Sequence, residues 1–195
     1  DVGFSAEDLK KCDLLFMGGA QDIQQKIVSG DLKKKNNKLS SFINSGMPGL
    51  YICGAYQFLG NYYKEADGTI IKGLGILDLY TENPGTNHPR LIGDIVFKPS
   101  IQGEFGMPNI IGFENHGGRT YLGKNVKPFG KVIKGFGNNG SDETEGVIYK
   151  NSFGSYLHGP ILPKNPQFSD YLIKITLERK YSKTIKLKKL DDVLE

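Results

Sequence analysis

The sequence has few cysteines, the residues that cross-link small secreted domains through disulfides. Its 195 residues include two cysteines, three histidines and no tryptophan. Two cysteines do not suggest a disulfide framework, and a reducing, cytoplasmic compartment suits them best. No apolar run approaches the length that crosses a bilayer, so we expect no transmembrane segment. The histidines show no ligand spacing with cysteine or acidic residues, so we expect no metal site.

The net charge of the chain is also small. The formal net charge is +4, and much of it lies in lysine runs at residues 33–35 and 183–189. Such runs usually form solvated faces, and no aromatic residues interleave the first of them. We therefore expect no nucleic-acid partner.

The size and composition predict one domain. A chain of 195 residues that is 38% hydrophobic can bury a substantial core, so residues 1–195 are expected to fold as a single unit. The first clear strand, at residues 13–17, comes early for a domain of mixed strands and helices. We therefore expect that an N-terminal strand and helix are missing.

Residues 49–60, GLYICGAYQFLG, hold the most informative pattern. An apolar run ends at Cys53, and two small residues and a helix-compatible segment follow. This order is typical of a strand that enters a tight turn and a helix, with one side chain exposed at the turn. A helix N-terminus favours thiolate over thiol and lowers a cysteine pKa from ~8.5. A small buried cysteine at the end of a core strand is the alternative, but it requires no small residues after it.

The order of the elements predicts an α/β fold with a parallel sheet and covering helices. In the first part of the chain we expect a strand at 13–17, a glycine turn at 18–20, helices at 23–28 and 32–44, and a strand at 50–52. The middle lacks helical windows, which predicts an antiparallel or mixed region with strands at 73–80, 91–98, 109–114 and 146–150. A last strand at 153–157 ends at His158, and residues 168–180 form an amphipathic helix.

Of the three histidines, His158 is best placed to work with Cys53. His88 lies in a polar loop, and His116 lies in a compact polar turn. Cys53, His158 and the glycine turn at 18–20 all follow predicted strands, and catalytic groups of α/β sheets gather at the carboxyl ends of strands. These ends can supply a nucleophile, a base and an oxyanion donor, as acyl transfer through a thioester requires. A capping or packing role is the alternative for His158.

Four segments resemble class I (triad-type) glutamine amidotransferases. The cysteine segment matches the nucleophile motif, although Ala55 stands where a glycine is common, and residues 17–22, MGGAQD, look like a turn of the cobyric acid synthase-like branch. Residues 112–121, GFENHGGRTY, and 154–166, GSYLHGPILPKNP, are similar to the glutaminase subunits of lipid II isoglutaminyl synthases. The resemblance covers nearly the whole chain and implies a flavodoxin-like α/β fold with a mostly parallel central sheet.

This resemblance implies that L-glutamine is hydrolysed to glutamate and ammonia. The ammonia would pass to a Mur ligase-like partner, MurT, in a heterodimer. That partner would use ATP and Mg²⁺ to amidate the α-carboxyl of D-glutamate in the lipid II stem peptide, giving D-isoglutamine. No cofactor is expected in this chain.

The resemblance also implies roles for individual residues. Cys53 would attack the glutamine carboxamide, and His158 would act as general acid and base. The amides of Gly54 and of the Gly19–Ala20 turn would hold the oxyanion.

Arg119 would bind the substrate α-carboxylate, because a guanidinium matches a carboxylate bidentately. Gln57 would line the pocket. A surface arginine and a helix-facing glutamine are the respective alternatives.

One departure from the class stands out. Class I amidotransferases commonly carry a glutamate two residues after the histidine, but Pro160 occupies that position here. A base without an orienting carboxylate loses tautomer control, which costs about 10⁴ in rate in a protease triad. We predict that the ligase subunit supplies this carboxylate across the interface.

Three alternative functions stay open. An amidotransferase acting on a corrinoid carboxylate is the nearest, but such enzymes are normally fused to a nucleotide-binding synthetase domain, and no P-loop motif occurs here. A peptidase or deglycase-like hydrolase would usually carry a histidine directly after the cysteine, where this chain has Gly54. The third alternative is a non-catalytic subunit that binds the ligase.

Overall fold

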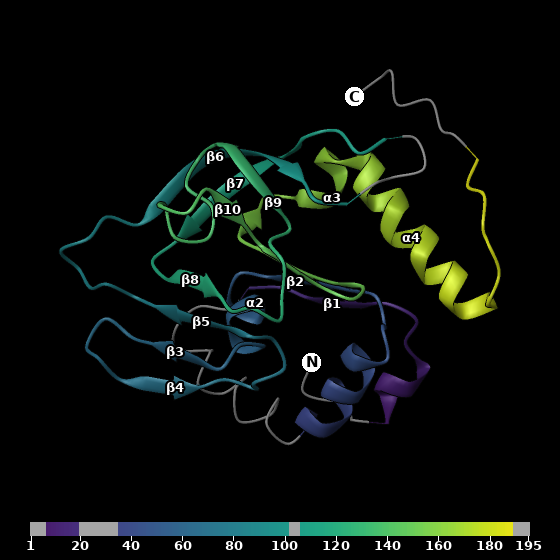
Figure 1. Ribbon diagram of the computed structural model, residues 1–195, viewed down its shortest axis with the longest axis horizontal. Coiled ribbons are helices and arrows are strands. Elements are labelled where there is room, and N and C mark those ends of the chain that lie inside the picture. Colours follow the sequence, from purple (N-terminus) through teal and green to yellow (C-terminus); the bar gives the residue numbers. More distant parts are fainter. Residues whose placement is uncertain (1–6, 20–34, 102–105, 189–195) are drawn as a thin grey trace.

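The computed structural model describes residues 7–19, 35–101 and 106–188. Its strands form three sheets, and β1 (Leu15–Met17) and β2 (Gly49–Ile52) run through the middle of the molecule (Figure 1). The predicted helix at 23–28 lies outside the described residues, whereas residues 35–44 of the predicted second helix are helical. Within these described ranges no helix combines the length and the apolar character needed to cross a membrane.

The central sheet has the order β1-β2-β12-β11, where β11 is Val147–Tyr149 and β12 is Ser152–Ser155. Strand β2 pairs in parallel with both β1 and β12, and β11 closes the sheet in antiparallel. The sheet is therefore mixed around a parallel centre, as expected for an α/β domain.

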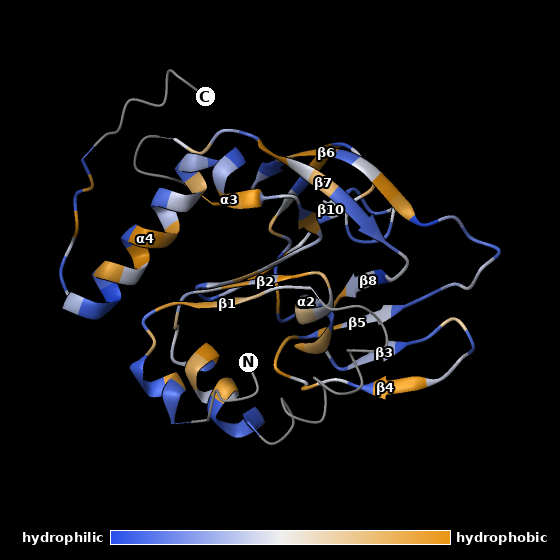
Figure 2. Ribbon diagram, turned by 180° about the vertical axis from the view of Figure 1, so that it is seen from behind, coloured by the Kyte–Doolittle hydropathy of each residue, from blue (hydrophilic) through white to orange (hydrophobic). Residues whose placement is uncertain are grey.

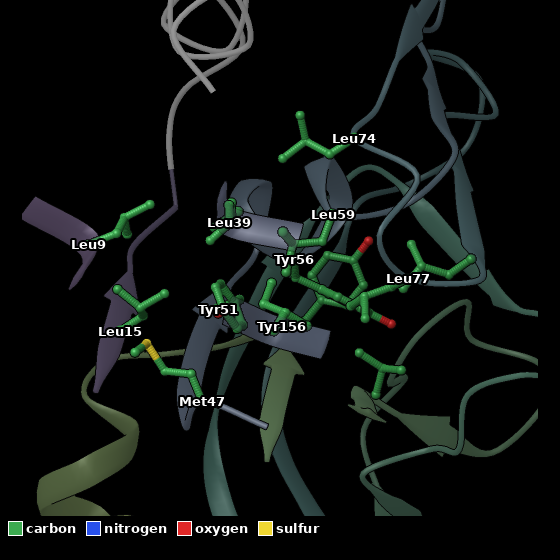
Figure 3. Packing of buried hydrophobic residues seen from close by; sticks show 14 residues of the cluster. Leu9, Leu15, Leu39, Met47, Tyr51, Tyr56, Leu59, Leu74, Leu77 and Tyr156 are labelled. Carbon is green, nitrogen blue, oxygen red and sulfur yellow. The ribbon is translucent and has the colours of Figure 1, made fainter. Parts of the chain in front are cut away.

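The central sheet is buried on both faces, because side chains of β2 alternate between two cores. Leu50 and Ile52 join the core that includes Phe153 of β12 and Phe168 of α4 (Pro166–Tyr181). Tyr51 joins the opposite core, whose members Leu9, Leu39, Tyr56 and Tyr156 are drawn in Figure 3. The 35–44 helix and α4 thus cover opposite faces. In Figure 2, β1 and β2 carry mostly apolar residues, whereas α4 carries both polar and apolar residues.

Two further sheets confirm most of the predicted mixed region, although its predicted strand at 146–150 is β11 of the central sheet. One has the order β10-β9-β6-β7-β13, with every pairing antiparallel. Its strands are β6 (Leu91–Pro99), β7 (Ile110–His116), β9 (Gly130–Lys134), β10 (Thr144–Glu145) and β13 (Leu157–His158). The other has the order β4-β3-β5-β8, from β3 (Tyr62–Lys64), β4 (Ile70–Lys72), β5 (Leu79–Glu82) and β8 (Arg119–Leu122). Figure 1 places these sheets on either side of β1 and β2.

The remaining elements are short. They are η1 (Asp8–Lys11), α2 (Gly54–Phe58) and α3 (Ile161–Lys164). Helix α2 follows β2 directly, as the sequence predicted.

The predicted strand at 73–80 is wrong over most of its length, because only its end belongs to β5. Residues 73–78 form no strand. Amides in this segment donate to the carbonyls of Phe58 and Leu59 at the end of α2, and Gly75 has a left-handed φ of 64°. Capping the helix end therefore takes the hydrogen bonds that a strand would have used.

The predicted last strand at 153–157 is also wrong as a single unit. Ser155 ends β12 in the central sheet, and β13 begins at Leu157 in the antiparallel sheet. The chain changes sheets at Tyr156. His158 is therefore not at the carboxyl end of a central strand, but on a two-residue strand that pairs with β7.

Candidate active site

Cys53 lies at a strained turn between β2 and α2. Its φ of 51° and ψ of −109° are unusual for a residue with a side chain, and such a conformation costs about 1–3 kcal/mol. The chain on both sides holds it there, because the Cys53 amide donates to the Ser155 carbonyl at 2.8 Å and the Cys53 carbonyl accepts from the Gln57 amide at 3.0 Å. Cys53 as a whole residue is half-buried. The local geometry is that of a nucleophile elbow.

Helix α2 supplies amides next to the thiol. Its first hydrogen bond is made by the Gln57 amide, so the amides of its first turn, beginning with Gly54, have no acceptor inside the helix. Such amides can stabilise a negative charge that forms beside Cys53. The oxyanion role of Gly54 stays a prediction.

Gly19 approaches both reactive side chains. A Cβ built on Gly19 would lie 3.3 Å from the Cβ of Cys53 and 3.5 Å from Cε1 of His158. The structure thus brings Cys53, His158 and the predicted glycine turn together at one point, and a side chain at residue 19 would crowd both partners. Ala20, the other predicted oxyanion donor, lies outside the described residues.

His158 is half-buried on β13, opposite Phe113 of β7. Its Nε2 atom is buried and has no hydrogen-bond partner among the described residues. Burial lowers the pKa of His158, and the positive charges of His116 and Arg90 lower it further. The imidazole is therefore held in the neutral form, in which it can accept a proton.

A polar network lies beneath the elbow. Gln57 is buried, and its Nε2 donates to the Tyr156 hydroxyl at 3.0 Å. The same hydroxyl lies 2.6 Å from Oγ1 of Thr120, which is 2.7 Å from Oγ1 of Thr81. The ring of His116 stacks on Tyr156 with centroids 3.6 Å apart. Gln57 thus has a structural contact, and its predicted contact with substrate stays a prediction.

Arg119 is tied to backbone oxygens. Its two terminal nitrogens donate to the carbonyls of Gly117 at 2.8 Å and of Pro89 at 2.7 Å. Arg90, next to Pro89, donates through Nε and one terminal nitrogen to Asn115, at 2.9 and 3.1 Å. Arg119 therefore anchors the loop that carries Arg90, the arginine whose charge reaches His158.

Sequence reasoning missed Arg90 and Tyr156, which influence or contact the predicted site residues His158 and Gln57. Tyr156 lies inside a family motif, but no spacing rule assigns its hydroxyl a role. Arg90 stands in a loop-like segment without a recognisable pattern. Only the contacts between distant segments identify them, so one sequence carries no signal for them. His88, in contrast, is exposed, as expected for its polar loop.

Comparisons with known proteins identify the family of the chain. A family model described as "CobB/CobQ-like glutamine amidotransferase domain" matches residues 1–166. The chain is 51% identical over 170 residues to "Lipid II isoglutaminyl synthase (glutamine-hydrolyzing) subunit GatD" of Staphylococcus aureus, covering 87% of this chain and 66% of that protein. It is 44% identical over 182 residues to the protein of the same name from Streptococcus pneumoniae, covering 93% and 68%.

More distant relatives include a "Probable cobyric acid synthase" of Methanothermobacter thermautotrophicus, 33% identical over 145 residues, which cover 69% of this chain and 27% of that protein. The chain spans about two thirds of the length of the two relatives named GatD, 66% and 68%.

Two solved structures share the fold. "Crystal structure of glutamine amidotransferase" has a TM-score of 0.64 at 14% identity, covering 88% of this chain and 82% of that one. "Structure of PurLQS from Thermotoga maritima" has a TM-score of 0.58 at 16% identity, covering 88% and 80%. At these identities the likeness concerns the fold alone, and it confirms the expected α/β amidotransferase-like fold.

Proposed function

Because this chain belongs to the CobB/CobQ-like glutamine amidotransferase domain family, we propose that it hydrolyses L-glutamine and delivers ammonia to a ligase subunit. In this proposal the ligase is Mur ligase-like, of the MurT type, and amidates the α-carboxyl of D-glutamate in lipid II. The observation that carries the proposal is the meeting of Cys53, His158 and Gly19 at a strained elbow. The 51% identity to a glutamine-hydrolysing subunit of lipid II isoglutaminyl synthase indicates the acceptor.

The proposed chemistry uses two side chains in sequence. His158 takes the thiol proton of Cys53 as the sulfur attacks the carboxamide carbon of glutamine, and the resulting oxyanion accepts hydrogen bonds from the amides of Gly54 and of the Gly19–Ala20 turn. The C–N bond then breaks as His158 donates a proton to the departing ammonia, leaving a glutamyl thioester. His158 next takes a proton from water, which attacks the thioester and releases glutamate and the thiol.

The whole chain is proposed to form one glutaminase domain. The family model ends at residue 166, but α4 continues beyond it and buries Phe168 and Leu172 in the core of the central sheet. A cytoplasmic location is proposed for the same chain, because Cys12 and Cys53 are both free thiols.

The orienting carboxylate for His158 is proposed to come from the ligase subunit. Glu114 accepts the amides of a neighbouring loop, and Glu145 accepts donors at the sheet change. Asp94 stands two strands from His158, beyond Phe113, which is ~10 Å at the usual strand spacing. None of these three carboxylates is placed to accept a hydrogen bond from the His158 imidazole, so a carboxylate from the partner would complete the site.

Partner dependence provides the test of this function. We expect weak glutaminase activity from the isolated chain and a rise of up to ~10⁴-fold when the ligase subunit is added, because the orienting carboxylate then controls the histidine tautomer. The measurement is glutamate release with and without the partner, together with glutamine-dependent amidation of lipid II. Equal turnover in both samples would contradict the partner's role, and amidation of a corrinoid instead of lipid II would contradict the acceptor.

Two arginines are proposed to recognise the substrate α-carboxylate. Arg119 is the residue predicted from the sequence, and its contact with the Pro89 carbonyl also places the guanidinium of Arg90. We expect Arg119→Ala and Arg90→Ala each to raise KM for glutamine by ~10-fold or more, because hydrogen bonds between charged groups contribute about 1.5–3 kcal/mol. Steady-state glutaminase kinetics check this. Lys124→Ala, which removes a cation from a neighbouring turn, is the control, and an unchanged KM in both arginine variants would refute the assignment.

A further inference from the structure

A buried carboxylate lies at the place where the chain passes from one sheet to the other. Glu145 ends β10 and has no exposed surface. Its Oε1 accepts two hydrogen bonds, from the Ser155 hydroxyl at 2.7 Å and from the Tyr156 amide at 2.9 Å. The Ser155 hydroxyl in turn accepts from the Leu157 amide at 3.0 Å. One carboxylate oxygen thus organises three consecutive residues.

These three residues join the two reactive side chains. The carbonyl of Ser155 accepts the Cys53 amide at 2.8 Å, and this bond links β12 to the elbow. His158 follows Leu157 directly and belongs to the other sheet. The distance between Cys53 and His158 therefore depends on the conformation of residues 155–157. A strand that continued straight through Tyr156 would carry His158 away from the elbow.

Burying the Glu145 carboxylate at this position costs free energy. Oε2 of Glu145 is buried without a hydrogen-bond partner among the described residues, and burial raises the pKa of Glu145 to about 7. Glu114 of β7 adds to this increase by repulsion. Tyr56 and Tyr156 also face this region, but burial raises the pKa of both, so they stay neutral. The polar contacts of Oε1 offset part of this cost.

We propose that Glu145 is a positioning residue, which holds the Ser155 hydroxyl and the Tyr156 amide and thereby sets the placement of His158 against Cys53. It touches neither substrate nor the reacting atoms. This inference rests on the proposed glutaminase function, which assigns Cys53 and His158 their roles.

Two variants test whether the hydrogen-bond acceptor at Oε1 of Glu145 is what positions His158. Glu145→Ala removes the acceptor, and we expect kcat to fall ~100-fold with little change in KM, the loss that a displacement of about 1 Å in the reacting groups can cause. Glu145→Gln keeps a carbonyl oxygen at Oε1, so we expect it to retain most of kcat.

A second readout does not depend on glutamine. Iodoacetamide alkylates thiolates, and the rate at Cys53 can be compared with that at Cys12 in the same sample by mass spectrometry. We expect the ratio of Cys53 to Cys12 alkylation to change in Glu145→Ala and to stay at the wild-type value in Glu145→Gln. Asn165→Ala is the matched control, because Asn165 is buried and makes three hydrogen bonds at 2.7–2.9 Å with the backbone of Ile111 in β7 and of Ile161 in α3. It should lower Tm without changing the ratio.

The experiments use the full chain purified with its ligase subunit. A wild-type kcat and alkylation ratio in folded Glu145→Ala would overturn the inference, as would equal losses in the alanine and glutamine variants. If the wild-type complex does not hydrolyse glutamine, the proposed function fails. The alkylation ratios then still decide whether Glu145 positions the two side chains.

Discussion

Replacing Cys53 with serine is expected to abolish glutamine hydrolysis. Removing the nucleophile of a hydrolase that works through a covalent intermediate costs about 10⁶ in kcat, and no other described cysteine lies at the elbow. The backbone at residue 53 should tolerate the change, because its conformation is set by bonds to Ser155 and Gln57 rather than by the side chain. The measurement is glutamate release by the complex with its ligase subunit.

The same variant distinguishes a lost nucleophile from a lost complex. Ammonia added in place of glutamine should still support amidation, because the ligase step does not need the thiol. Cys12→Ser is the matched control and should keep wild-type hydrolysis, since Cys12 caps a short helix far along the sequence from the elbow. Substantial hydrolysis by Cys53→Ser would show that the reaction does not proceed through a thioester at this residue.

Replacing His158 with alanine is expected to reduce kcat by ~10²–10⁴-fold, the usual contribution of a positioned acid and base. The loss should come in kcat, because His158 acts on the leaving ammonia and on water rather than in binding glutamine. Steady-state kinetics of the complex measure it. His88→Ala is the control, because this histidine is exposed on a loop and should change neither constant.

The pH profile gives a second check on His158. Burial and the charges of His116 and Arg90 lower its pKa, so the neutral base persists to a pH below the ordinary histidine value. The acidic limb of kcat/KM should therefore lie below ~6.5. Arg90→Ala removes one of these positive charges and should move the limb to higher pH. An acidic limb that stays fixed in this variant would contradict the electrostatic origin of the shift.

The elbow shows how much of a site can be predicted from local sequence. An apolar strand, a cysteine, two small residues and a helix occupy adjacent positions, so their geometry depends on bonds within a few residues of Cys53. The parallel centre of the sheet and the helix at 35–44 follow from similarly local patterns. These predictions agree with the structure because periodicity and turn chemistry act over short distances.

The errors have a different origin. The segment at 73–78 has the apolar pattern of a strand, but its amides are taken by the end of α2. The sequence also does not show that Arg119 donates to the carbonyls of Gly117 and Pro89, contacts that leave its role in binding substrate a prediction. In both cases the local conformation depends on which carbonyl accepts the hydrogen bond from the donor. A single sequence does not reveal which carbonyl this is.

By itself, the sequence determined that a thiol stands at a turn between a buried strand and a helix in an α/β domain. The tertiary structure alone decided how His158 reaches that thiol. The change of sheet at Tyr156 depends on a carboxylate ten residues upstream of Ser155, held in a core that excludes water. Burial leaves Ser155 and Tyr156 no water to bond with, so Glu145 determines the path of the chain there.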